Sequence, residues 1–288
     1  MIQTVRHIAS LFKLRIGVAI MLSALAGIAV SPGPDLAAWK VVVLALAVMA
    51  SSASAGALNQ YFERDLDARM ERTRNRPFVT GAFQAGPLWL SAILLILAVA
   101  VVAAALATNL AAAFHVFMGA FVYGIVYTIW LKRRTWWNIV VGGLAGSFAV
   151  LAGASAVDPM LAPAPVILAV VLFLWTPPHF WSLAAALNKE YARADVPMLP
   201  VVVGNPLAAK IILAHTVVLV ALSVAPIFFG LGWIYGLGAA LGGFLFLRAS
   251  IAFVRRPTRK FAMANFKASL LQLGLLQLAA VADYLVMS

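Results

Sequence analysis

The stretch Asn59-Gln-Tyr-Phe-Glu63-Arg-Asp65-Leu-Asp67-Ala-Arg-Met-Glu-Arg72-Thr-Arg74-Asn-Arg76-Pro77 interrupts an otherwise apolar chain. It brings together four acidic and five basic residues, although the chain of 288 residues contains only nine acidic residues in all. Of the whole chain, 64% is hydrophobic and 10% charged, whereas soluble domains are about a quarter charged. Because charge is costly in a membrane protein, a cluster of this density indicates a site that handles a charged ligand.

Apolar runs recur on both sides of this stretch, each near the length of about 20 residues that spans a bilayer as a helix. The mean hydropathy of +1.01 agrees with such a chain. No soluble domain remains between the runs, so we expect an all-α polytopic membrane protein with one membrane domain over residues 1–288. The sliding-window rule predicts nine spans, at residues 14–32, 38–58, 88–107, 110–130, 138–157, 164–186, 208–229, 232–251 and 264–285.

The basic residues predict the orientation of these spans. All lysines and arginines except Lys40 fall in the N-terminal segment or in and beside the segments that follow the even-numbered spans. The positive-inside rule therefore predicts a cytoplasmic N-terminus and an outer C-terminus. The net charge of +12 is then explained by topology and substrate, which argues against nucleic acid as a partner. We expect the first apolar run to be a retained span rather than a cleaved signal peptide.

Within the charged stretch, Asn59, Glu63 and Asp67 are spaced four residues apart. If the second span continues as a helix past Asn59, these side chains share one face, and Asp65 points elsewhere. A row of oxygen ligands suits Mg²⁺, which proteins hold with one or two carboxylates and substrate phosphates. The alternative is a solvated loop with internal salt bridges. In that alternative the carboxylates would bind no ligand, although charge in apolar surroundings is costly. We therefore predict a metal site.

Basic side chains follow this row. Arg72, Arg74 and Arg76 come directly after it, and Lys132 and Arg133 follow the fourth span. Guanidinium groups bind phosphate oxygens through paired hydrogen bonds, so these residues together predict a pyrophosphate site. A positive-inside anchor also explains Lys132 and Arg133. Nearby aromatic side chains fit core or interface packing, or π faces that stabilise a cation: Phe121, Tyr123, Tyr127 and Trp130.

A second candidate region begins near the end of the sixth span. Pro177 and Pro178 remove two backbone donors, which predicts a kink, and kinked membrane helices tend to line cavities. His179 follows directly, and both a structural role and a role as ligand or base fit this position. In the next loop, Glu190 is the better candidate metal ligand, because Asp195 is five residues further on and poorly placed for a shared helical face. Lys189 and Arg193 are candidate partners of phosphate or carboxylate groups.

Together these motifs resemble the UbiA superfamily of intramembrane prenyltransferases, over most of the chain. The first motif of that superfamily, Asn-Asp-x-x-Asp-x-x-x-Asp, reads Asn59-Gln60-x-x-Glu63-x-x-x-Asp67 here. The resemblance is strongest to its protohaem IX farnesyltransferase (haem O synthase) branch. The segments that carry it are residues 59–77, 131–135, 175–180 and 191–200.

Three positions depart from the pattern of that branch. Asp195 stands where glycine is usual, and Leu14 stands where a Lys-Pro-Arg-Ile segment has proline. In the second Asp-x-x-x-Asp motif, Ala194 replaces the last acidic residue and leaves Glu190 alone. These departures affect the expected second metal site more than they affect the expected reaction.

The resemblance implies helices around a central cavity that opens to the cytoplasmic side of the inner membrane. It implies that Mg²⁺ at Asn59, Glu63 and Asp67 binds the head of farnesyl diphosphate. The farnesyl group would pass to the 2-vinyl group of haem B, a substrate, and water would complete haem O. His179 would orient the haem or ligate its iron. Further expected partners are membrane lipid, haem A synthase and assembly proteins of cytochrome oxidase.

Three rival functions remain open at this point. The same fold could prenylate an aromatic or quinone precursor, which the Pro-His-Phe segment at 178–180 disfavours. A transporter would place ionisable groups near the bilayer midplane, where only His115 and His215 are found. A non-enzymatic haem-handling protein would not need the carboxylate row.

Overall fold

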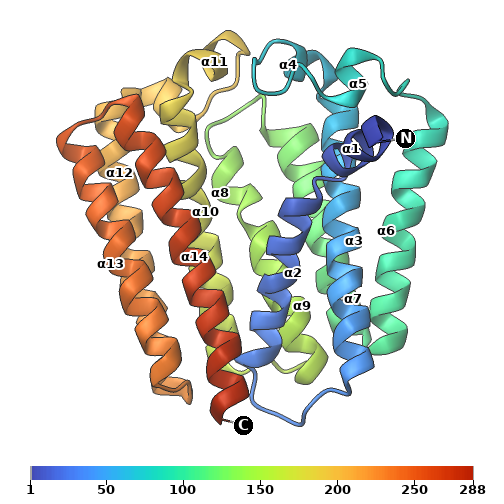
Figure 1. The fold of residues 1–288 in the computed structure, drawn as a ribbon, viewed down its shortest axis with the longest axis vertical. Coiled ribbons are helices and arrows are strands. Elements are labelled where there is room, and N and C mark those ends of the chain that lie inside the picture. The colour runs from blue at the N-terminus through green and yellow to red at the C-terminus, as the bar shows by residue number, and fades with distance from the viewer. Residues whose placement is uncertain (1, 288) are drawn as a thin grey trace.

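The computed structural model describes residues 2–287, which form an upright bundle of helices with no strand in that range (Figure 1). The elements are α1 (Ile2–Leu11), α2 (Leu14–Ala29), α3 (Ala38–Phe62), α4 (Arg64–Ala68), α5 (Pro77–Thr80), α6 (Pro87–Ala107), α7 (Leu110–Phe121), the π-helix η1 (Val122–Leu131), α8 (Asn138–Gly142), α9 (Leu144–Val157), α10 (Pro163–Ala186), α11 (Asn188–Arg193), α12 (Leu199–Val224), the 3₁₀-helix η2 (Ala225–Phe229), α13 (Trp233–Arg255) and α14 (Arg259–Met287).

The number of spans agrees with the prediction of nine. Within the described residues, eight helices are long and apolar enough to cross a membrane. A ninth results when α1 and α2, which are bent by 45° relative to each other, count as one broken span. The seventh span differs most from the prediction, because its helix begins at Leu199 instead of residue 208. Its first turns are set off by Gly204, whose φ of +78° departs from helical geometry just before Pro206.

Two helices far apart in sequence, α2 and α9, cross at very short range. A Cβ atom on Gly27 would lie 2.1 Å from the carbonyl oxygen of Val150, and one on Gly153 would lie 1.9 Å from that of Ala24. Neither contact is possible for a larger residue. Small residues allow close helix packing in membranes, where the hydrophobic effect does not drive helices together. The first span is thereby held against the centre of the bundle.

Helix α10 continues through Pro177 and Pro178, so the kink predicted at this pair does not divide the helix. The prolines remove backbone donors, but the helix is packed against α9, α12 and α14. The Thr176 hydroxyl also donates to the Leu172 carbonyl at 3.0 Å, in the turn just before the prolines. Packing and side-chain hydrogen bonds of this kind allow proline inside a membrane helix.

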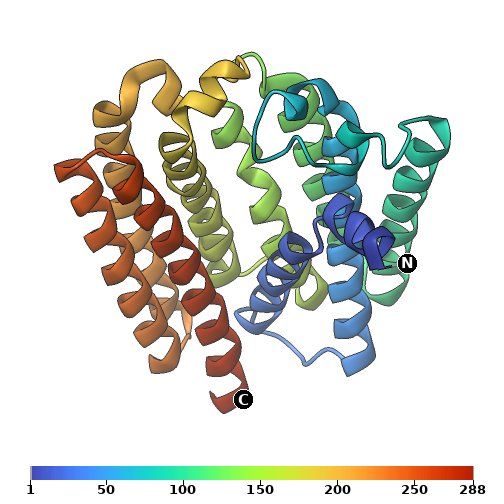
Figure 2. The ribbon, with the colours of Figure 1, turned by 45° about the horizontal axis from the view of Figure 1, so that its top comes forward.

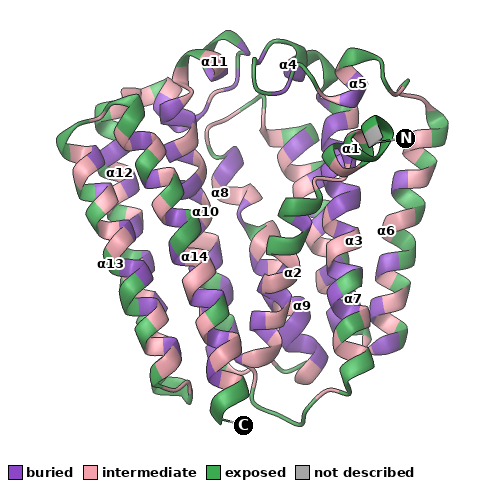
Figure 3. Cartoon of the chain, viewed as in Figure 1, coloured by how far each residue is buried: buried purple, intermediate pink, exposed green. Residues whose placement is uncertain are grey.

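One end of the bundle gathers the charged segments. We call it the charged end: α1, α4, α5 and α11 lie there, and the C-terminus lies at the opposite end (Figures 1 and 2). The spans that lead into its two charge-rich loops, α3 and α10, have 61% of their apolar window buried (Figure 3). Both charge-rich loops therefore follow helices that lie in the interior of the bundle.

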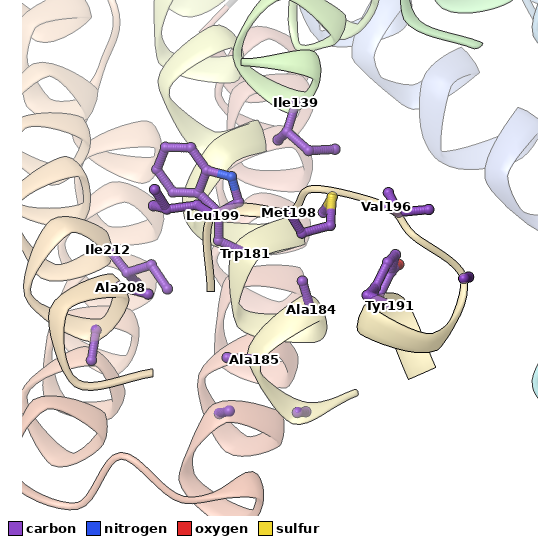
Figure 4. Close-up of a cluster of buried hydrophobic side chains, with 14 of the residues drawn as sticks. Ile139, Trp181, Ala184, Ala185, Tyr191, Val196, Met198, Leu199, Ala208 and Ile212 are labelled. Atoms are coloured by element: carbon purple, nitrogen blue, oxygen red, sulfur yellow. The ribbon is translucent and has the colours of Figure 1, made fainter. Parts of the chain in front are cut away.

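A buried apolar cluster joins the two charge-rich loops. It is built around Trp181 of α10, Tyr191 of α11 and Met198, which directly precedes α12 (Figure 4). Leu66 and Met70, from the charged stretch, belong to the same cluster. The regions around Glu63 and Glu190 are thus fixed relative to each other by one core.

Candidate active site

The three residues predicted as a row stay on one face, although the helix does not continue through them. Helix α3 ends at Phe62, Glu63 forms the junction and α4 follows. The helical hydrogen-bond spacing nevertheless persists, because Glu63 N–H donates to Asn59 O at 3.0 Å and Asp67 N–H donates to Glu63 O at 2.7 Å. Asn59, Glu63 and Asp67 are only 2%, 1% and 2% exposed, so the row lies inside the protein.

Each member of the row is held by a cation from a different part of the chain. Lys13 donates from Nζ to Asn59 Oδ1 at 2.7 Å. Arg76 donates from Nη1 to Asp67 Oδ2 at 2.6 Å, and Lys132 forms an ion pair with Glu63 Oε2. Buried carboxylates need such partners, since an isolated buried charge is strongly unfavourable.

Lys13 is the site residue that sequence reasoning missed, because its charge was assigned to topology. It lies in the break before α2, with a left-handed backbone (φ +47°) that non-glycine residues seldom adopt. Its side chain passes over Gly56, and Nζ also donates to the Tyr123 hydroxyl at 3.1 Å. The Lys-x-Arg-Ile pattern at residues 13–16 was the available signal.

The π-helix η1 fixes which atom of Asn59 faces Lys13. The Thr128 hydroxyl donates to the Tyr123 carbonyl five residues earlier at 2.8 Å. That hydroxyl has one proton, so it must accept the bond from Asn59 Nδ2 at 3.1 Å. The amide nitrogen therefore points to Thr128, and Oδ1 points to Lys13. Long π-helical segments are rare and often occur at functional sites.

Aromatic faces from the same π-helix line the cations. Tyr123 and Tyr127 stack with ring centroids 5.4 Å apart. Lys13 Nζ is 5.4 Å from the Tyr123 centroid, and Lys132 Nζ is 5.6 Å from the Tyr127 centroid. These distances allow cation–π attraction. Tyr123 and Tyr127 therefore lie beside the cations of the site. This position fits the alternative in which their π faces stabilise a cation.

The charges of this site favour an anionic ligand. Three cations, Lys13, Arg76 and Lys132, surround two carboxylates, which leaves one positive charge in excess. Glu63 Oε1 is buried and has no hydrogen-bond partner. An unpaired carboxylate oxygen beside Asn59 Oδ1 and Asp67 matches the oxygen chemistry that Mg²⁺ prefers. The residues present thus fit a divalent cation bound together with a phosphate group.

Arg133 is engaged elsewhere. Its guanidinium makes two hydrogen bonds of 2.7 Å to Asp65, so these two side chains form a salt bridge at the surface. The hydrogen bond from Arg133 lowers the pKa of the Asp65 carboxyl. Four other predicted basic residues are exposed and form no ion pair within residues 2–287: Arg72, Arg74, Lys189 and Arg193.

The second loop contributes less to the row than its motif indicates. Glu190 borders a separate pocket of about 580 Å³ with Lys189 and Arg259, and its Oε2 is buried without a partner. In the part of the chain that the structure describes, no three acidic, histidine or cysteine side chains converge as a metal-binding group. The structure therefore does not join Glu190 to Glu63 and Asp67.

The side chain of His179, in α10, packs against α14. Its ring stacks between Trp175 and Phe266, with centroid distances of 4.2 and 4.5 Å. The Ser269 hydroxyl donates to the Phe266 carbonyl at 2.7 Å, so it accepts the bond from His179 Nδ1 at 2.7 Å. The neutral ring therefore carries its proton on Nδ1 and keeps a lone pair on Nε2.

Known proteins are similar to this chain in sequence, and others are similar to it in fold. A relative called protoheme IX farnesyltransferase 2, from Paramagnetospirillum magneticum, is 58% identical over 288 residues, which cover 99% of each chain. Protoheme IX farnesyltransferase 1 of the same organism is 47% identical over 97% of this chain and 99% of its own.

A solved UbiA homolog from Archaeoglobus fulgidus, bound to DMAPP and Mg²⁺, has a TM-score of 0.71 at 15% identity. That similarity covers 93% of this chain and 98% of the homolog. The UbiA prenyltransferase family matches residues 20–271. The chain is therefore a multi-pass membrane protein that belongs to the UbiA prenyltransferase family.

Proposed function

We propose that this protein transfers the farnesyl group of farnesyl diphosphate to the 2-vinyl group of haem B, which yields haem O and diphosphate. The relatives called protoheme IX farnesyltransferase support this substrate pair. The observation that carries the proposal is the buried row of Asn59, Glu63 and Asp67, surrounded by three cations. That arrangement suits a pyrophosphate group with a divalent metal.

The cations neutralise the diphosphate. Lys13, Arg76 and Lys132 approach the row from three segments, so they can contact phosphate oxygens from several sides. Charge that develops on the leaving oxygens is stabilised most strongly by donors that are already in place. Exposed Arg72, Arg74, Lys189 and Arg193 lie toward the same end and would attract anionic substrates from solution.

Mg²⁺ is the metal we propose, held by Asn59, Glu63 and Asp67. The unpaired Oε1 of Glu63 supports this assignment. When bound, the ion supplies Lewis-acid stabilisation of the departing diphosphate. Glu190 is proposed as a ligand of any second ion, which its buried, unpartnered Oε2 supports.

The reaction breaks the bond between farnesyl C1 and the phosphate oxygen, and the electron pair leaves with diphosphate. The vinyl π electrons of haem then form the new carbon–carbon bond with the allylic cation. Water adds to the resulting cation, and its proton passes to solvent. Tyr123 and Tyr127 offer π faces beside the row that stabilise positive charge before the carbon–carbon bond forms.

His179 is proposed to orient the haem through its iron. Ser269 holds Nδ1, which leaves the Nε2 lone pair available, and no side chain of residues 2–287 bonds to it. Histidine ligands commonly bind metal through one nitrogen while the other is held by a hydrogen bond.

We also propose a single domain in the inner membrane, with the N-terminus and the charged end in the cytoplasm and the C-terminus outside. All lysines and arginines except Lys40 support this orientation. Haem A synthase and assembly proteins of cytochrome oxidase are proposed as protein partners, because haem O must pass to enzymes that use it.

The acceptor assay tests this function. Purified protein is incubated with farnesyl diphosphate and Mg²⁺, with haem B or 4-hydroxybenzoate offered in equal amounts. We expect haem B alone to gain one farnesyl group and one hydroxyl group, with the hydroxyl labelled in ¹⁸O water. Prenylated 4-hydroxybenzoate would instead support the quinone-precursor alternative, and no product with either acceptor would reject the proposal.

A further inference from the structure

The most unusual side chain of the site is Lys13, which no part of the proposed reaction requires to touch Asn59. We propose that Lys13 is a positioning residue that holds Asn59 Oδ1 in the ligand-free protein and releases it to the metal when a diphosphate enters. This inference rests on the proposed function only in that the site binds a diphosphate and a divalent ion.

The position of Lys13 is specifically built. Its left-handed backbone (φ +47°) lies at the bend between α1 and α2, a conformation that is costly for a side-chain-bearing residue. A Cβ on Gly56 would lie 3.2 Å from Lys13 Cδ and 3.4 Å from its Cβ and Cγ, so the glycine leaves room for the stem. Strain that is maintained by surrounding structure is typical of functional positions.

The contact with Asn59 is directed at the atom that a metal would use. Thr128 accepts from Asn59 Nδ2, so Oδ1 is the atom that faces the site. Lys13 Nζ lies 2.7 Å from Oδ1 and thus occupies one of its lone pairs with a positive charge. A divalent cation at this oxygen has to compete with the ammonium group.

Diphosphate relieves this competition. In its absence, the three cations of the site are Lys13, Arg76 and Lys132. Their positive charge exceeds the negative charge of the two carboxylates by one. A diphosphate brings negative charges that the ammonium can bind instead of a neutral amide oxygen. Asn59 Oδ1 is then free for the metal. Diphosphate and metal should therefore strengthen each other's binding, and this coupling is reciprocal by thermodynamic necessity.

The test measures Mn²⁺ binding by electron paramagnetic resonance on the purified full chain, at fixed free Mn²⁺, with and without inorganic pyrophosphate. Wild-type protein should bind Mn²⁺ weakly alone and about tenfold more tightly with pyrophosphate, within the usual range of such couplings. Lys13→Met should bind Mn²⁺ about tenfold more tightly than wild type without pyrophosphate, and pyrophosphate should enhance its binding less than it does in wild type. A residue that only supports the fold would change binding in the opposite direction.

Two further variants make the result specific. Arg15→Gln removes a neighbouring exposed charge and should bind Mn²⁺ as wild type does. Gly56→Ala keeps the ammonium but displaces its stem, so it should shift Mn²⁺ binding in the direction of Lys13→Met. It also carries the test if Lys13→Met does not fold.

Unchanged or weaker Mn²⁺ binding in both Lys13→Met and Gly56→Ala would overturn the inference. The assay contains neither haem nor a prenyl chain, so its outcome is separate from that of the acceptor assay. If Lys13 releases Asn59 Oδ1 as proposed but the protein forms no haem O, only the proposed function is contradicted.

Discussion

At the scale of single residues, the site is defined by which oxygen atoms remain available. Glu63 uses Oε2 for Lys132 and keeps Oε1 unpaired, and Asn59 presents Oδ1 because Thr128 holds its nitrogen. A buried polar atom without a partner is unfavourable, so it is expected where a ligand completes the structure. The unpaired Oε1 of Glu63 therefore marks the place of the metal and the diphosphate.

Thr128 offers a test of this arrangement. Thr128→Val removes the acceptor for Asn59 Nδ2, so the amide can rotate and present nitrogen to the metal. We expect divalent-ion binding to weaken by about tenfold, as for other groups that orient a ligand. Thr128→Ser keeps the hydroxyl and serves as the control. Equal binding in the valine and serine variants, measured by Mn²⁺ titration, would show that Thr128 does not orient Asn59.

The row could be predicted from the sequence because it depends on local spacing alone. Asn59, Glu63 and Asp67 recur every four residues, and the hydrogen-bond ladder keeps that spacing across the break at Glu63. Their partners could not be predicted in the same way. Lys13 is 46 residues from Asn59, and Lys132 is 69 residues from Glu63, so both contacts depend on tertiary packing.

At the scale of elements, the crossing of α2 and α9 sets the position of Lys13, which directly precedes α2. Gly153→Ala would place a methyl group inside the contact with Ala24, so the helices must separate. We expect a loss of about 3 kcal/mol or more, seen as a lower Tm in detergent. Gly274→Ala, in α14 with open space around it, should be neutral or slightly stabilising. Similar Tm losses in both variants would contradict the close crossing.

The turn after α11 makes a second, independent prediction. Asp195 has a left-handed backbone (φ +55°), a conformation that glycine adopts without strain. Its exposed ion pair with Arg69 at 3.2 Å contributes little. Asp195→Gly and Asp195→Ala both remove that pair, but only glycine relieves the strain.

We therefore expect the glycine variant to be more stable than the alanine variant by about 1 kcal/mol, measured by thermal unfolding. Ala192→Gly, inside α11, should show the reverse preference because glycine is unfavourable within a helix. A more stable alanine at position 195 would refute the strain argument.

Helix type and breaks were harder to predict than helix existence. Apolar length predicted the spans, but the π-helical turns of η1 depend on contacts of Thr128 and Lys132 with α3 and the site. The left-handed Gly204 divides α12 for a local reason that hydropathy does not register. The unbroken α10 reflects packing around its two prolines.

At the scale of the whole molecule, the charged end and the opposite end should face different compartments. The chain contains no cysteine, so single cysteines can report their exposure without background. We expect Met160→Cys, at the opposite end, to react with a membrane-impermeant maleimide in spheroplasts. Arg134→Cys, at the charged end, should react only after permeabilisation. The reverse pattern would invert the proposed orientation.

The central claim is that the buried row, rather than surface charge, carries the farnesyl transfer. Asp67→Asn and Asp65→Asn remove one negative charge each from the same short helix, α4, but Asp67 is 2% exposed and Asp65 lies at the surface. The most direct measurement is the rate at which each purified variant converts haem B to haem O with farnesyl diphosphate and Mg²⁺, followed by product mass.

We predict that Asp67→Asn loses about 100-fold or more of the rate, because it removes a ligand of the metal that stabilises charge on the departing diphosphate. Asp65→Asn should keep the rate within severalfold, because exposed ion pairs contribute little. A near-normal rate for Asp67→Asn, or equal losses in both variants, would contradict the account.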